Sequence, residues 1–204
     1  MLIGLVNYGM GNINSIVKKL KIVGAKYKII NSPKCLENID KLILPGVGHF
    51  GKAIENLHKM NLIDPLKNAV LEKKKPVLGI CLGMQLMALK SEEGKARGLG
   101  WVDATVRKFS IQDKLNFKIP QMGWNTISIN KKSVLMKNIP EESEFYFIHS
   151  FYIKCNNKED ILNTTLYESE FVSAIQKDNI FGVQYHPEKS HEIGEKLFKN
   201  FIQI

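Results

Sequence analysis

The sequence predicts a single α/β domain, in which helices flank a central, mostly parallel sheet that carries added antiparallel strands. Its 204 residues, 44% of them hydrophobic, are enough for one globular core and few for two full domains. In the first half, short β-branched runs alternate with amphipathic segments, which favours parallel strands connected by helices. After about residue 97, short alternating runs separated by turns indicate antiparallel strands.

The first half is predicted to contain repeated strand, helix, strand units. A strand over residues 2–6 leads into a helix that begins at the N-cap Asn12 and ends at Gly24. Asp64 and Pro65 have the form of an N-cap and a first helical proline, and their helix runs to the lysines at 73–75. Further strands are predicted at residues 27–30, at residues 41–44, where Pro45-Gly46 ends the strand, and at residues 76–80.

The second half is predicted to be mostly β-structure and to end in a helix over residues 192–202. Residues 171–176 and 180–184 flank a polar turn and predict a hairpin. No repeat, linker or low-complexity segment interrupts the chain, so we expect residues 1–204 to form one domain. Other strands are predicted at residues 101–109, 117–119, 125–129 and 145–148.

Composition argues against several classes of protein. The net charge is +9, but scattered lysines carry nearly all of the excess, since Arg97 and Arg107 are the only arginines. Base readout and bidentate phosphate contacts favour arginine, so we expect no nucleic-acid partner. No apolar run approaches the roughly 18 residues of a membrane helix, and we expect no membrane partner.

The N-terminus and the cysteines indicate the compartment. The N-terminus has the pattern of a strand rather than of a signal peptide, which predicts a cytoplasmic protein. The three cysteines, Cys35, Cys81 and Cys155, are an odd number in a reducing compartment, so we expect no disulfide framework.

A candidate nucleophile lies where a buried strand meets a helix, in the segment Gly79-Ile80-Cys81-Leu82-Gly83. The flanking glycines allow a tight strand-to-helix turn, as in the Gly-x-Ser-x-Gly nucleophile elbow. Cys81 would then stand at the carboxyl edge of the sheet, where a helix N-terminus stabilises a thiolate and offers N–H groups to an oxyanion. The alternative is a buried structural cysteine, since free cysteine often belongs to the core.

His186 is the candidate base, because it follows a predicted strand in the segment His186-Pro187-Glu188. Proline holds this segment extended, and residues two apart in an extended chain point the same way. Glu188 can therefore orient the imidazole and stabilise the imidazolium, as the third member of a triad. The alternative is a metal site with His191, but no helical metal-binding spacing is present. We expect no metal and no other cofactor.

A third element, Pro45-Gly46-Val47-Gly48, opens at the same sheet edge as Cys81. Its glycines allow backbone N–H groups to turn toward an oxyanion, although a strand followed by Pro-Gly is also ordinary turn chemistry. Of the remaining histidines, His58 and His191 are expected at the surface, and His49 and His149 in loops at this edge.

Together these elements resemble the class I (triad) glutamine amidotransferases, and among them the glutaminase subunits of imidazole glycerol phosphate synthases. The resemblance spans nearly the whole chain in the family's order. The segments that carry it are Tyr8-Gly9-Met10-Gly11-Asn12, Pro45-Gly46-Val47-Gly48, Gly79-Ile80-Cys81-Leu82-Gly83-Met84-Gln85, Met122-Gly123-Trp124-Asn125, Phe147-Ile148-His149-Ser150 and His186-Pro187-Glu188-Lys189-Ser190.

The resemblance implies a flavodoxin-like fold and hydrolysis of glutamine to glutamate and ammonia. Cys81 would attack the side-chain amide, His186 would protonate the leaving ammonia, and water would release glutamate from the thioester. The oxyanion would be held by N–H groups of Leu82 and of Val47 and Gly48. The glutamine pocket would be formed by Gly46, Gly83, Gln85, His149, Ser150 and Phe151.

The resemblance also implies a partner. In this family a (β/α)₈ cyclase receives the ammonia and makes imidazole glycerol phosphate and an aminoimidazole carboxamide ribonucleotide for histidine synthesis, and we expect a one-to-one pair. No part of this chain can be that barrel, because barrels need about 250 residues. For Trp124 the alternative is a core aromatic. The implied interface residues are Asn12, Ser15, Gln121, Met122, Gly123, Trp124 and Asn125.

Two departures from the family pattern concern the partner rather than the triad. The family has aspartate at the position of Asn7 and histidine at the position of Gln121, and we expect both residues toward the cyclase. They leave a second hypothesis open, in which a related glutaminase subunit supplies ammonia for amidation of a surface-sugar precursor with a cyclase-like partner. A catalytically silent regulatory subunit is a third hypothesis, which the intact Cys81, His186 and Glu188 argue against.

Overall fold

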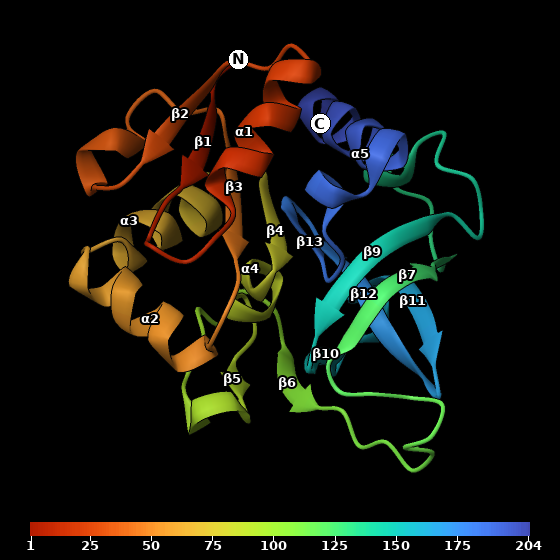
Figure 1. Cartoon of the computed structure of the whole chain (residues 1–204). Helices are drawn as coiled ribbons and strands as arrows, with labels where there is room; N and C mark the ends of the chain where they lie inside the picture. Colours follow the sequence, from red (N-terminus) through yellow and green to blue (C-terminus); the bar gives the residue numbers. More distant parts are fainter.

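In the computed structural model, helices cover both faces of one large sheet (Figure 1). The structure describes residues 1–204, apart from the side chain of Lys95. Five parallel strands form the middle of the sheet in the order β2-β1-β3-β4-β13, which confirms the predicted α/β class. Their bounds are β1 Ile3–Val6, β2 Tyr27–Ile30, β3 Lys41–Gly46, β4 Val77–Cys81 and β13 Ile180–Val183.

Antiparallel strands extend the sheet beyond β13. The predicted hairpin joins β12 to β13, and β10, β6 and the short edge strand β5 follow in space. A separate two-stranded sheet pairs β7 with β9. The bounds are β5 Lys90–Ser91, β6 Ala104–Lys108, β7 Gln121–Thr126, β8 Ser128–Ile129, β9 Glu144–His149, β10 Phe151–Cys155, β11 Ile161–Tyr167 and β12 Ser169–Lys177.

The sheet separates two hydrophobic cores. Ile3 and Leu5 pack with α1 and α5 on one face, and Val6 packs with α2 and α3 on the other, because successive strand residues point to opposite faces. No helix among the described residues has the length and apolar character needed to cross a membrane. The helices are α1 Ile13–Ile22, α2 Phe50–Lys59, α3 Ile63–Lys67, α4 Leu82–Leu86 and α5 His191–Gln203.

Most local signals of the first half are confirmed. Asn12 caps α1, since its Oδ1 accepts a hydrogen bond from Ser15 N at 3.4 Å, and Gly24 follows the helix with φ +72°. Helix α3 begins before Asp64, at Ile63, and continues as a π-helical turn to the lysines at 73–75. Strand β3 runs through Pro45 to Gly46 instead of ending at residue 44, and so reaches the level of Cys81.

The second half departs more from the prediction. Residues 117–119 are not a strand, because Lys118 N and O both bond to the Tyr167 hydroxyl in place of a neighbouring strand. The strand predicted at residues 125–129 is divided between β7, which begins at Gln121, and β8. The elements α2, β5, β10 and β11 were not predicted, although Phe50, Ala53 and Leu57 of α2 carry a helical spacing.

We predict that Gly83→Ala destabilises the protein more than Gly24→Ala. A Cβ at position 83 would lie 1.7 Å from the backbone oxygen of Leu44, whereas nothing lies within 4 Å of one at position 24. Overpacking against backbone should cost about 3 kcal/mol, and the left-handed conformation at position 24 about 1 kcal/mol. Denaturant unfolding of both variants measures this, and equal losses would contradict the packing argument.

Candidate active site

Cys81 occupies a strained turn between a strand and a helix. It is the last residue of β4, α4 begins at Leu82, and the Cys81 backbone has φ +53° and ψ −112°. Non-glycine residues rarely adopt such a conformation, and it persists only where the surrounding structure enforces it. The nucleophile elbow predicted from the sequence is therefore present, at the carboxyl edge of the sheet.

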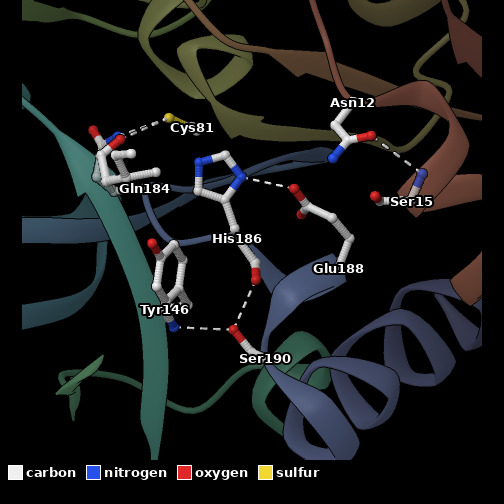
Figure 2. A network of polar contacts seen from close by, with 9 residues as sticks. Asn12, Ser15, Cys81, Tyr146, Gln184, His186, Glu188 and Ser190 are labelled. Carbon is white, nitrogen blue, oxygen red and sulfur yellow. Dashed lines mark hydrogen bonds and ion pairs between the residues drawn. The ribbon is translucent and has the colours of Figure 1, made fainter. Parts of the chain in front are cut away.

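His186 reaches Cys81 from the adjacent strand. Strand β13 pairs with β4 through Val183 and Ile80, and His186 follows β13 by three residues. The backbone of His186 is held on both sides: its N–H donates to Tyr146 O at 2.8 Å, and its carbonyl accepts from Ser190 Oγ at 2.7 Å. Ser190 Oγ in turn accepts from Tyr146 N at 3.0 Å (Figure 2). This clamp fixes the position of the imidazole.

Glu188 orients the ring as the sequence predicts. Its Oε1 lies 2.7 Å from His186 Nδ1, and both side chains are only 2% exposed. The other ring nitrogen, Nε2, is turned toward Cys81 (Figure 2) and has no hydrogen-bond partner among the described atoms. Burial opposes protonation of His186, but the negative charges of Cys81 and Glu188 outweigh it and raise its pKa above the ordinary value.

Gln184 is a site residue that the sequence did not indicate. Its Nε2 donates to Cys81 Sγ at 3.5 Å, and its Oε1 accepts from Gln85 Nε2 at 3.0 Å. Gln85 also donates to Phe151 O at 2.9 Å. Gln184 is fully buried and comes two residues before His186, so it extends in the same direction from the end of β13. Gln184 therefore contributes a hydrogen-bond donor to the sulfur of the candidate nucleophile.

A cavity of about 310 Å³ opens beside the Cys81 side chain, a size suited to a small ligand. It gathers most of the residues implied by the family resemblance: Val47, Gly48, Cys81, Leu82, Gln85, His149, Ser150 and Phe151. Four further lining residues were not predicted for the pocket, although two of them belong to segments that carry the family resemblance: Glu93, Pro120, Ile148 and Lys189. Glu93 is the only acidic residue of the wall, and its Oε2 accepts from Phe50 N at 2.7 Å. His186 and Glu188 lie behind Cys81 rather than in the wall.

Gly46 and Gly83 do not line this cavity. They allow β3 and α4 to approach, since a Cβ on Gly46 would lie 2.4 Å from Tyr8 Oη and 3.0 Å from Gly83 N. The Tyr8 hydroxyl donates to Pro45 O at 2.7 Å and anchors the segment that precedes Val47 and Gly48. Both glycines therefore act through close packing of the elbow.

Of the two histidines expected in loops at this edge, His49 does lie in one, between β3 and α2, whereas His149 lies in a strand. His149 is the last residue of β9 and is buried among aromatic rings, and His49 is the N-cap of α2. Burial lowers the pKa of His149 to about 3, and its Nδ1 lies 2.8 Å from Phe151 O, so Nδ1 carries the proton of a neutral ring. The prediction of a loop at His149 was wrong, because pairing between Gln121 and His149 extends β9 as far as this residue.

The residues expected at a partner interface differ in their exposure. Met122 and Trp124 are 62% and 45% exposed on the same side of β7, so Trp124 is not a core residue. The expectation that Gln121 faces a partner is wrong, because its side chain is only 3% exposed and points into the core. Asn12 is exposed at the start of α1, while Ser15, Gly123 and Asn125 are half-buried.

Neither a larger groove nor a metal site offers an alternative to this cavity as the active site. A larger open groove of about 790 Å³ lies beside Trp124 and the start of α5, but Cys81 is not among its lining residues. His191 is exposed and stacks on Trp124 with ring centroids 5.1 Å apart. Among the described residues, no group of three or more His, Cys, Asp or Glu side chains could hold a metal ion.

A family model described as "Glutamine amidotransferase class-I" matches residues 4–204. The chain belongs to this family. Class I glutamine amidotransferases that are similar over the full length include "Imidazole glycerol phosphate synthase subunit HisH 2" of Methanococcus maripaludis, 49% identical over 99% of both chains. The protein of the same name from Pseudomonas aeruginosa is 45% identical, and "subunit HisH 1" of Campylobacter jejuni is 47% identical, each over 100% of both chains.

Solved structures support the same fold at lower sequence identity. A putative GMP synthase protein of Thermoplasma acidophilum has a TM-score of 0.74 at 21% identity, and the match covers 100% of this chain and 92% of that one. The structure titled "PurLQS from Thermotoga maritima" has a TM-score of 0.76 at 16% identity over 99% of this chain and 97% of its own. These likenesses concern the fold alone.

We predict that Glu188→Gln lowers kcat/KM for glutamine hydrolysis about 10²- to 10⁴-fold and moves the alkaline limb of its pH profile to lower pH. The carboxylate raises the pKa of His186, so its removal lets the imidazolium lose its proton at lower pH. Initial rates of glutamate formation between pH 6 and 10 measure this. An unchanged alkaline limb would show that the limb reports another group.

Proposed function

We propose that this chain is the glutaminase subunit of an imidazole glycerol phosphate synthase, with Cys81, His186 and Glu188 as its catalytic triad. The observation that carries the proposal is the strained Cys81 at the wall of a cavity, with a His186–Glu188 pair arriving from the adjacent strand. Full-length relatives at 45–49% identity carry that subunit's name. The family match over residues 4–204 supports one amidotransferase domain for the whole chain.

The proposed reaction begins with attack of the Cys81 thiolate on the side-chain amide carbon of glutamine. Before the attack, His186 takes the proton of the thiol and becomes an imidazolium. The negative charge on sulfur then has this cation and the amide donor of Gln184 beside it. The tetrahedral oxyanion would receive N–H groups from Leu82, at the start of α4, and from the Val47-Gly48 segment.

Collapse of this intermediate breaks the C–N bond, and the His186 imidazolium gives its proton to the departing ammonia. His186 then takes a proton from water, which attacks the thioester carbonyl, releases glutamate and restores Cys81. Throughout, Glu188 holds the imidazole in one orientation and one tautomer. Glu93, the acidic residue of the cavity wall, is positioned to bind the ammonium group of glutamine.

The ammonia has to reach an acceptor before it is protonated in water, which favours direct transfer to a second protein. We infer that this partner is a (β/α)₈ cyclase bound one-to-one, and that Met122 and Trp124 belong to the surface that meets it. Two large apolar side chains exposed side by side on one strand are typical of a protein interface. We place the complex in the cytoplasm, where amino-acid biosynthesis takes place.

A second candidate keeps the glutaminase and changes the acceptor to a surface-sugar precursor. Asn7 is half-buried and its Oδ1 accepts from Gly9 N at 3.2 Å, so this departure lies in the turn that leads to Asn12. Relatives from three organisms carry numbered subunit names, HisH 1 or HisH 2. A numbered copy is consistent with division of labour between two such subunits.

We predict that Cys81→Ala abolishes glutamate formation but spares partner binding and ammonia-driven turnover of the acceptor. The substitution removes only the nucleophile, and added ammonia bypasses the glutaminase step. Glutamine- and ammonia-dependent rates of the complex, measured side by side, test this. Undiminished glutamine hydrolysis would refute the assignment of Cys81.

We predict that the chain, expressed together with a cyclase subunit of this enzyme, restores growth without histidine to a strain that lacks its own glutaminase subunit. Cys81→Ala is the matched control and should restore no growth at low ammonium. If the complex is soluble and hydrolyses glutamine but the strain does not grow, the result would favour the surface-sugar precursor as the acceptor. Neighbouring sugar-nucleotide genes rather than histidine genes would point the same way.

A further inference from the structure

The carboxylate of Glu188 has one oxygen that the triad does not use. Oε1 is paired with His186 Nδ1 at 2.7 Å, while Oε2 is buried and has no hydrogen-bond partner among the described atoms. Leaving a buried oxygen without a partner is costly, and buried polar groups nearly always have a hydrogen-bond partner. A donor for Oε2 would hold Glu188, and with it the imidazole, in one orientation.

Asn12 presents such a donor. Its amide nitrogen is turned toward the Glu188 carboxylate from the start of α1 (Figure 2). The orientation of the amide follows from the helix cap, because Oδ1 accepts from Ser15 N at 3.4 Å and Nδ2 must then face away from the helix. The turn Pro187–Lys189, which contains Glu188, packs against α1.

Electrostatics favour the same pairing. The N-terminus of α1 carries the positive end of its helix dipole, and no acidic side chain lies in its first turn to neutralise it. His186 Nδ1 pairs with the other carboxylate oxygen at 2.7 Å, and the neighbouring Lys189 places its Nζ over the Tyr146 ring, 5.2 Å from the ring centroid. A helix N-terminus and an amide donor both attract a carboxylate.

We propose that Asn12 is a positioning residue of the triad, whose amide donates to Glu188 Oε2 and so keeps His186 directed at Cys81. Asn12 is exposed, and it lies where the family resemblance places the partner. A partner that presses on the start of α1 closes this contact, which couples docking to the geometry of the base. The inference rests on the proposed glutaminase function.

The test compares Asn12→Ser and Asn12→Asp in the complete chain with its cyclase partner bound, because docking closes the contact. Both keep an oxygen that caps α1, and Asn, Asp and Ser are similar N-caps, so unfolding free energies should stay close to the parent. Serine is too short to reach Oε2, and an ionised aspartate offers no donor. We expect kcat for glutamine hydrolysis to fall about 10- to 100-fold in both variants at pH 8, with KM changed less than about twofold.

The pH profile separates positioning from capping. As pH falls, the carboxyl group introduced by Asn12→Asp becomes protonated and regains an O–H donor of the original length. The ratio of its kcat to that of Asn12→Ser should therefore rise toward acid pH. The rate at which a glutamine-mimicking diazoketone alkylates Cys81, followed by intact mass, gives the same comparison where turnover is slow.

Parental kcat and alkylation rates in both variants would overturn the inference, and so would equal losses in both at every pH. The glutaminase assignment is judged separately. If the parent hydrolyses glutamine and Cys81→Ala does not, a failure of the Asn12 test concerns Asn12 alone. If Cys81→Ala matches the parent, the proposed function fails first.

Discussion

The backbone conformation of Cys81 is the constraint on which the site depends. A cysteine at φ +53° and ψ −112° costs about 1–3 kcal/mol, which the surrounding packing has to offset. Strand β4 supplies the support, because it lies in the middle of the sheet and pairs with both β3 and β13. Helix α4 then sits so close to the sheet that Cβ atoms at Gly79 and Gly83 would clash with backbone. The glycines around Cys81 are a consequence of this close approach.

The same three strands assemble the chemistry. Strand β3 ends beside Cys81 and delivers the Val47-Gly48 segment, and β13 ends beside it and delivers Gln184 and His186. Because parallel strands end at a common edge, groups far apart in the chain meet there without long side chains. Burial then makes their charges interdependent, so that Cys81 and Glu188 together hold a proton on an imidazole that burial alone would leave neutral.

Neighbouring residues of β7 alternate between the exposed surface and the buried packing behind the cavity. Met122 and Trp124 are exposed on β7, whereas Gln121, one residue earlier, is buried opposite His149. The departure from the family at residue 121 is therefore a change in the packing behind the cavity. The amide of Asn12, at the exposed start of α1, is by contrast turned toward the Glu188 carboxylate (Figure 2).

The sequence by itself determined the local elements of the site: the elbow at Cys81, the extended His186-Pro187-Glu188 segment and the cap at Asn12. Each depends on residues within a few positions, where proline, glycine and capping side chains restrict the backbone directly. Only the tertiary structure decided that Gln184 contacts the sulfur, that Glu93 enters the cavity wall, and that Gln121 and His149 are buried. These depend on strand pairings between distant segments, whose register no local pattern contains.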